Sequence, residues 1–242
     1  MSAKGIRDRK EAIRERVWRI LEEQGASRFP GTRGRIPNFI GAERAAGRLA
    51  GVEAWLESEV VKANPDAPQL PVRVRALEDG KVVYMAVPRL RSSKPFVLLD
   101  PSQIPTSPRR AASIRGAAGA GRPVHAGRVR RVDLVVCGTV AVNRRGVRVG
   151  KGGGYSDLEF GLLAERGLID DRTSIATTVH PLQVLDEELP ETDHDFRVDL
   201  VVTPDEVIRC RRARRPPGIL WDHLEPDRRR EIPALAALAR HQ

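Results

Sequence analysis

Residues 148–157 place glycines and charged side chains in one short segment. Four glycines occupy the five positions from Gly150 to Gly154, and residues 150–154 are called the glycine loop below. Such a backbone exposes consecutive N–H groups, and a helix that starts just after them directs the positive end of its dipole at the loop. The segment therefore predicts an anion site, in the simplest case for a phosphate.

The side chains around the glycine loop have the charges that phosphate chemistry requires. Arg148 and Lys151 add positive charge, and Asp157 offers the hard oxygen ligand that Mg²⁺ prefers. A structural interpretation stands beside this one, in which the glycines only form a tight turn and Asp157 stabilises a helix N-terminus. The loop is not a Walker A motif, because no Gly-Lys-Ser/Thr closes it, and it fits the dinucleotide fingerprint poorly.

The flanking patterns predict a strand before the loop and a helix after it. Val132–Val142 is an apolar run, and Leu158, Leu162 and Leu163 recur with helical spacing. Elsewhere, helices are expected over residues 6–24, 41–56, 68–77, 158–166 and 235–238, and strands over 59–63, 82–87, 96–99, 132–136, 139–142, 174–179 and 198–203, with a short element at 183–185. This alternation predicts a three-layer α/β fold, with a mostly parallel sheet, helices on both faces and the glycine loop at the carboxyl ends of the strands.

Length and composition favour one domain over residues 1–242. Hydrophobic residues make up 40% of the chain, enough for a core, and aromatic residues only 4%. Residues 101–127, rich in Pro, Ser, Gly, Ala and Arg, are expected to be irregular, as a flexible linker or as a lid over the ligand. Residues 210–242 form a basic extension that Ile219, Leu220 and Trp221 should fold back onto the domain. Residues 29–39 are expected to be an ordered loop that buries Phe29, Ile36 and Phe39.

The net charge of +10 favours anionic partners, either nucleotides, polyanionic metabolites or nucleic acid. Nucleic acid is disfavoured because the chain has few aromatic side chains on which bases could stack.

Cys137 and Cys210 lack the spacing of a zinc site or a disulfide framework. No apolar run reaches the roughly 18 residues of a membrane span, so a soluble, cytoplasmic protein is expected. The sequence does not specify an oligomeric state.

Three motifs, taken together, resemble one known family. Arg148-x-Gly150-x-Gly152-Gly153-Gly154-Tyr155-x-Asp157 resembles the nucleotide loop of the 5-formyltetrahydrofolate cyclo-ligase (methenyltetrahydrofolate synthetase) family. Lys10-x-x-x-Arg14 is similar to the N-terminal ATP-binding pair of that family. The C-terminal signature of the family is resembled, in the same order, by Gln183, Leu189-Pro190, His194-Asp195, Val198-Asp199 and Val201-Val202-Thr203.

Other details resemble the divergent methenyltetrahydrofolate synthetase domain-containing branch. The similar segments are Gly150-Lys151-Gly152 with Tyr155-Ser156-Asp157-Leu158-Glu159, Arg35-Ile36-Pro37-Asn38-Phe39, Asn64-Pro65-Asp66 and Val87-Pro88-Arg89-Leu90. Two positions depart from the usual family pattern, since Lys151 and Ser156 stand where tyrosines are common. These departures keep open a different substrate within folate- or thiamine-related cofactor metabolism.

The resemblance implies an ATP- and Mg²⁺-dependent ligase that closes 5-formyltetrahydrofolate to 5,10-methenyltetrahydrofolate. It implies catalytic roles for Arg148 and Lys151 and a metal-binding role for Asp157. ATP binding is implied for Lys10, Arg14, Gly150, Gly152, Gly153, Gly154 and Tyr155, and substrate contact is expected for Arg35 and Asn38. Structural alternatives are a surface helix pair for Lys10 and Arg14, a packing role for Tyr155, loop packing for Arg35 and Asn38, and a hydrogen-bonded turn at His194-Asp195. An RNA-binding protein is the remaining alternative function.

Overall fold

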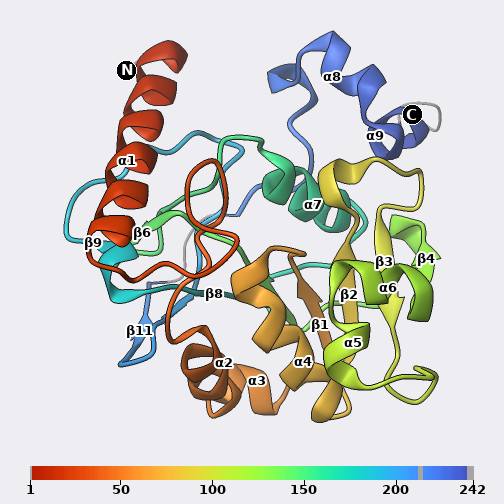
Figure 1. Cartoon of the computed structure of the whole chain (residues 1–242). Coiled ribbons are helices and arrows are strands. Elements are labelled where there is room, and N and C mark those ends of the chain that lie inside the picture. The colour runs from red at the N-terminus through yellow and green to blue at the C-terminus, as the bar shows by residue number, and fades with distance from the viewer. Residues whose placement is uncertain (1, 212–214, 239–242) are drawn as a thin grey trace.

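The large sheet has eight strands in the part of the chain that the structure describes. In this computed structural model, which describes residues 2–211 and 215–238, helices cover both faces of that sheet (Figure 1). The strand order is β11 (Val207–Arg209), β10 (Leu200–Val202), β8 (Ser174–Thr178), β5 (Leu134–Cys137), β1 (Val60–Ala63), β2 (Val82–Ala86), β3 (Phe96–Leu99) and β4 (Arg122–Val124). Neighbours from β10 to β2 pair in parallel, whereas β11, β3 and β4 pair antiparallel. The predicted mostly parallel α/β fold is confirmed.

Neighbouring residues of each central strand contribute to different cores, as the two-residue period of a strand requires. Val61 and Ala63 join the core under α2 (Ala42–Ala50), α3 (Glu53–Leu56) and α4 (Leu70–Glu78), which directly follows η1 (Ala67–Gln69). Val60 lies in the opposite core, which includes Phe160 and Leu163 of α7 (Tyr155–Ala164). Because both faces are covered, the central strands are rich in apolar residues, although β1 also contains the buried Lys62 and β8 the buried Thr177 and Thr178.

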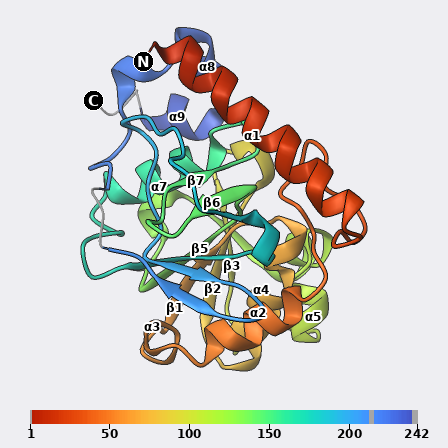
Figure 2. The same ribbon diagram turned by 90° about the vertical axis from the view of Figure 1, so that its left-hand side faces the viewer.

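A second, three-stranded sheet was not predicted, and it changes the setting of the glycine loop. It has the order β7 (Arg148–Val149), β6 (Ala141–Asn143) and β9 (Val184–Leu185), the last preceded by η4 (Pro181–Gln183). The glycine loop follows β7, so the expectation that its strand belongs to the large parallel sheet is wrong. The long helix α1 (Ala3–Glu23) packs on this small sheet through Ile13, Val17 and Leu21 (Figure 2).

Residues 101–127 are more regular than their composition indicated. They contain α5 (Pro108–Ala111), α6 (Ile114–Ala120), β4 and the start of η3 (Ala126–Arg128). Ala111, Ala112 and Ala117 are fully buried, because small side chains allow the short helices to approach the sheet closely. The expectation of an irregular segment is wrong, while its role as a lid stays a prediction.

The C-terminal segment folds back on α7, as its apolar residues predicted. It contains η5 (Trp221–His223), α8 (Pro226–Glu231) and α9 (Pro233–Leu238), and it lies beside α7 and the short η2 (Pro88–Leu90) in Figure 1. The basic stretch at 212–214 lies outside the described residues.

In the 29–39 loop Ile36 and Phe39 are buried as expected, but Phe29 is 93% exposed. Within residues 2–211 and 215–238, no helix is long and apolar enough to span a bilayer.

Candidate functional site

The glycine loop leaves β7 and enters α7 through two left-handed residues. Gly152 has φ 101° and Gly154, the N-cap of α7, has φ 63°, values that favour glycine. Position 153 also has no room for a side chain, because a Cβ on Gly153 would lie 2.8 Å from Tyr155 Cδ2. Among the described residues, the N–H groups from 152 to 156 donate no hydrogen bond, and no side chain caps α7. The loop therefore presents free donors at a helix N-terminus.

Helix α1 brings two cations to the glycine loop. Arg14 Nε donates to Gly150 O at 2.6 Å, and Arg14 Nη1 pairs with Glu11 at 2.6 Å. Lys10, one turn earlier, reaches Asp195 Oδ2 at 2.5 Å. Their spacing of four residues places both on one side of the helix. The packing of α1 on the small sheet holds that side against the loop.

Arg148 is buried at the start of the loop and is tied to Asp157 in the first turn of α7. Arg148 Nη2 lies 2.5 Å from Asp157 Oδ1, and its guanidinium carbon lies 3.9 Å from the centre of the Phe196 ring. Burial disfavours the charge of Arg148, but the carboxylate of Asp157 holds the pKa of Arg148 above its ordinary value. Arg148 Nε is buried and has no hydrogen-bond partner among the described residues, which leaves one donor of this cation unused.

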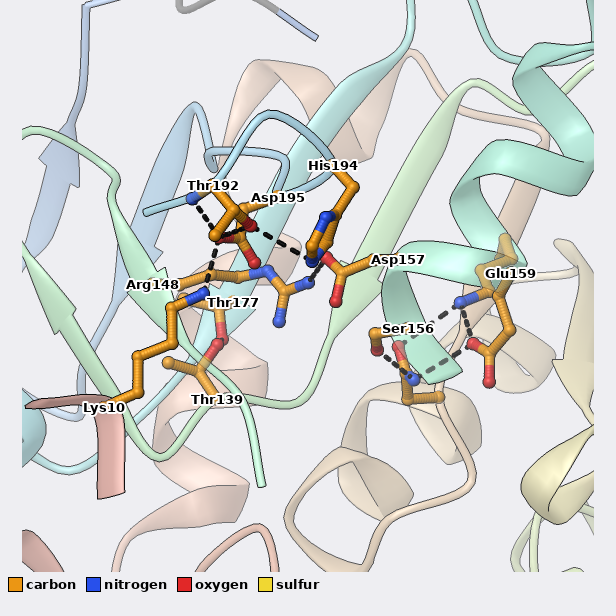
Figure 3. Close-up of polar contacts among 12 residues, drawn as sticks. Lys10, Thr139, Arg148, Ser156, Asp157, Glu159, Thr177, Thr192, His194 and Asp195 are labelled. Atoms are coloured by element: carbon orange, nitrogen blue, oxygen red, sulfur yellow. Dashed lines mark hydrogen bonds and ion pairs between the residues drawn. The ribbon is translucent and has the colours of Figure 1, made fainter. Parts of the chain in front are cut away.

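Asp157 and Asp195 are the carboxylates paired with Arg148 and Lys10 (Figure 3). Burial raises the pKa of Asp157 despite the opposing charge of Arg148, and the negative charge of Asp195 raises it further. For Asp195 burial acts in the same direction, but Lys10 and Thr192 outweigh it and hold the pKa of Asp195 below its ordinary value. Each carboxylate is therefore matched with one cation in this arrangement.

The donor chemistry at Asp157 and Asp195 suits Mg²⁺, which binds proteins through one or two carboxylates and retains several waters. The described residues contain no cluster of three or more His, Cys, Asp or Glu side chains suited to a metal.

Lys151 connects the glycine loop to the carboxyl end of β1. Its Nζ lies 2.8 Å from Asp66 Oδ1, in the turn that follows this strand. Gly138, after β5, lies close by, since a Cβ there would be 3.1 Å from Asp66 Oδ2. The loop therefore does lie near the carboxyl ends of two central strands, although its own strand belongs to the small sheet.

A buried polar cluster supports the first turn of α7. Lys62 Nζ lies 2.5 Å from Glu159 Oε2, and the Asn64 amide donates to Glu159 Oε2 at 3.1 Å and to Ser156 Oγ at 2.7 Å. Burial raises the pKa of Glu159, and the charge of Lys62 opposes this. Ser156, which departs from the usual family tyrosine, is thus hydrogen-bonded into the cluster (Figure 3).

The structure gathers most of the predicted residues, but not Arg35 and Asn38. Among the described hydrogen bonds neither side chain reaches the glycine loop: Asn38 Nδ2 donates to Phe29 O at 2.6 Å, and Arg35 is exposed. Their substrate contact stays a prediction. Sequence reasoning missed the ion-pair roles of Asp66 and Asp195. In the predicted turn, Thr192 N does donate to Asp195 Oδ2 at 2.6 Å. The pairing of Asp195 with Lys10 depends instead on tertiary placement.

The family model described as 5-formyltetrahydrofolate cyclo-ligase matches residues 6–204. This range includes most of α1, the glycine loop, Asp157 and Asp195. The chain belongs to this family.

Relatives of the cyclo-ligase family include two named methenyltetrahydrofolate synthase domain-containing protein. The Mus musculus protein is 39% identical over 95% of this chain and 63% of its own length. The Homo sapiens protein is 36% identical over 100% of this chain and 64% of its own length. The chain thus spans less than two thirds of these relatives, and both bear the name of the branch that the sequence resembles.

The fold of the family is also seen in a solved structure. The NMR structure of Aquifex aeolicus 5,10-methenyltetrahydrofolate synthetase matches with a TM-score of 0.52 and 22% identity, over 85% of this chain and 94% of the other. At this identity the likeness concerns the fold alone, and it agrees with the layered arrangement described above.

Proposed function

We propose that the protein catalyses the ATP- and Mg²⁺-dependent closure of 5-formyltetrahydrofolate to 5,10-methenyltetrahydrofolate. One observation carries the proposal: Lys10 and Arg14 of α1, Arg148 of β7 and Lys151 of the loop itself gather around the glycine loop and its carboxylate partners, and the N–H groups from 152 to 156 are free among the described residues. Such a convergence of donors suits the phosphates of a nucleotide. Membership of the cyclo-ligase family supports the choice of reaction.

The reaction has two bond-forming steps. The formyl oxygen of the substrate attacks the terminal phosphorus of ATP, the bridging P–O bond breaks, and ADP leaves. The folate N10 then attacks the activated formyl carbon, a C–N bond forms, and the C–O bond breaks to release phosphate as N10 loses its proton. Phosphoryl transfer of this kind depends mainly on positioning and on neutralisation of charge.

The residues of the site fit these needs. Lys10 and Arg14 would hold the nucleotide phosphates, Arg148 and Lys151 would neutralise the transferred group, and the loop amides would orient it. Mg²⁺, held by Asp157 and Asp195, would supply further neutralisation of the phosphate charge. The ion pairs of the free protein keep cations and carboxylates in place, and phosphate oxygens would replace the carboxylates as partners of Lys10 and Arg148.

A direct assay tests the proposal. Purified protein mixed with 5-formyltetrahydrofolate and MgATP should form the absorbing methenyl product, and omission of ATP or Mg²⁺ should abolish it. Tight binding of MgATP without any product would contradict cyclo-ligase activity.

Lys10→Met offers a residue-level test that keeps the aliphatic stem. We expect its KM for ATP to rise about 10-fold or more, because a charge-assisted contact contributes roughly 1.5–3 kcal/mol. The matched control is Lys4→Met, which removes the same charge from an exposed position of the same helix. Equal kinetics in the two variants would refute a role for Lys10 in ATP binding.

One observation favours a second candidate, in which the same loop binds nucleotide but the substrate is another formamide of cofactor metabolism. Ser156 stands where family members usually have a tyrosine, and it is hydrogen-bonded to Asn64 of the buried cluster. A ring that could contact the folate is therefore missing at this position. Nucleotide turnover that requires a formamide other than 5-formyltetrahydrofolate would support this candidate.

A further inference from the structure

Arg228 reaches the glycine loop from α8, in a part of the chain beyond the family match at residues 6–204. Its Nη2 donates to Gly153 O, and its guanidinium carbon lies 5.3 Å from the centre of the Tyr155 ring. A Cβ on Gly154 would lie 3.6 Å from Arg228 Nη2. Three consecutive residues at the start of α7 are thus in contact with, or close to, this one arginine.

The charge of Arg228 differs from that of the other cations at the loop. Lys10, Arg14, Arg148 and Lys151 each pair with a carboxylate. Within residues 2–211 and 215–238, Arg228 has no carboxylate partner, and its one hydrogen bond is to a carbonyl. A guanidinium has five N–H donors, so donors remain available to a ligand. A half-buried cation without a carboxylate, beside free loop amides, favours an anion.

The neighbouring arginines of α8 have different roles. Arg229 donates to the carbonyls of Leu224 and Trp221 and so holds the segment together. Arg230 is exposed and pairs with Asp227 in the same helix. Only Arg228, among these three arginines, contacts the glycine loop.

We propose that Arg228 is an oxyanion-binding residue of the glycine-loop site, contacting a nucleotide phosphate or a carboxylate of the folate-like substrate. This inference rests on the proposed function of the loop and extends it with a cation from outside the family match. Tyr155 orients the guanidinium through its ring face, an arrangement that favours arginine over lysine.

Binding titrations test the proposal, with three ligands measured separately: the Mg²⁺ complex of a non-hydrolysable ATP analogue, 5-formyltetrahydrofolate, and inorganic triphosphate. Arg228→Ala should weaken one or more of them by about 10- to 100-fold, the effect of one lost charge-assisted contact. Arg228→Lys, which keeps the charge but loses the planar fork, should fall between Arg228→Ala and the wild type.

The ligand that is affected identifies the source of the oxyanion. Weaker binding of the ATP analogue and of triphosphate assigns Arg228 to a phosphate, and weaker binding of the folate alone assigns it to a carboxylate. Arg230→Ala removes the same charge from the same helix and should stay within about twofold of the wild type, because its exposed charge is screened by solvent.

Unchanged binding of all three ligands by Arg228→Ala and Arg228→Lys, with thermal unfolding like that of the wild type, would overturn the proposal. An equal loss of ligand binding in Arg230→Ala would overturn it too, since the loss would then follow from the net charge of the protein and not from a contact made by Arg228. If the wild type binds triphosphate but neither ATP nor the folate, the proposed function fails, while the triphosphate titration still tests Arg228.

Discussion

Lys62 and Glu159 form an ion pair with almost no exposure to solvent, 2% and 3% for the two side chains. Removal of one partner leaves the other charge buried, which costs about 3–5 kcal/mol, whereas apolar replacement of both is often close to neutral. We therefore expect Lys62→Met and Glu159→Leu each to lower the free energy of unfolding by that amount, and the double variant to recover most of the loss. Urea denaturation of the four proteins measures this.

The exposed pair Arg230–Asp227, with side chains 75% and 80% exposed, is the control. Asp227→Ala should change the free energy of unfolding by less than about 1 kcal/mol. Additive losses in the Lys62 and Glu159 double variant would show that the two side chains do not act as a pair. Because Asn64 links the pair to Ser156, the single variants should also disturb the start of α7.

At the scale of elements, a capping box at η4 fixes the chain beside the small sheet. His180 Nδ1 accepts from Leu182 N at 3.2 Å, while Gln183 Oε1 accepts from His180 N at 2.8 Å. The amide of Gln183 donates in turn to Thr139 O at 2.9 Å and Val140 O at 3.1 Å. Protonation of His180 Nδ1 would remove the acceptor on which this arrangement depends.

This geometry predicts a pH dependence of stability. Burial lowers the pKa of His180, and Asp205 only partly opposes the shift. A histidine whose folded-state pKa lies below its unfolded value of about 6.5 contributes stability above that value, and the contribution is lost as pH falls through the folded-state pKa. His180→Asn keeps a capping oxygen but does not titrate. The advantage of wild type over His180→Asn in the free energy of unfolding should therefore shrink between pH ~7.5 and ~5.5.

The control for this measurement is His223→Asn, at an exposed position of η5. Its difference from wild type should vary less over the same pH range, because in the described part of the chain no hydrogen bond uses its ring. A His180→Asn difference that stays constant with pH would show that the capping nitrogen does not control stability there.

The elements that sequence could predict are those with a local signal. The helical period of α1 and the apolar runs of β1, β5 and β8 appear in single segments of the chain, and the structure places them as expected. Strand pairing is not local, so nothing in Ala141–Asn143 indicated that it would leave the large sheet for a small one. Helix α8 was missed because Pro226–Glu231 has almost no apolar residue to form a periodic pattern.

The same limit applied to the site. Lys151 lies within the glycine loop, and Arg148 and Asp157 lie close to it in sequence, so a local pattern could suggest roles for them, whereas Lys10 and Arg14 were connected to the loop only by the family resemblance. Asp66, Asp195 and Arg228 reach the loop through tertiary contacts. Their residue types are too common elsewhere in the chain for a sequence pattern to single them out.

For the whole molecule, the C-terminal segment completes the surface around the start of α7. Ile219, Ile232 and Leu235 pack with Leu158 and Leu162 of α7 in a separate hydrophobic cluster. Leu90, fully buried in the same cluster, has the unfavourable φ of 50°. No strand of the large sheet belongs to this cluster among the described residues. We therefore expect the segment to open without unfolding of the domain, so that its stability is a local property.

Leu235→Ala tests this separation, since Leu235 is fully buried. A leucine-to-alanine change in a core costs about 2–5 kcal/mol, and here that loss should favour local opening of the C-terminal segment. Hydrogen exchange measured by mass spectrometry should become faster in residues 219–238 and 152–162, whereas β5 and β8 keep the wild-type rates.

The control is Ile114→Ala on α6, where the side chain is 50% exposed and belongs to none of the hydrophobic clusters. It should leave exchange in the glycine loop unchanged. Because an open segment carries Arg228 away from Gly153, Leu235→Ala should also reproduce the weaker oxyanion binding of Arg228→Ala. Faster exchange in the segment with wild-type binding of every ligand would mean that the segment stabilises α7 without contributing to the site.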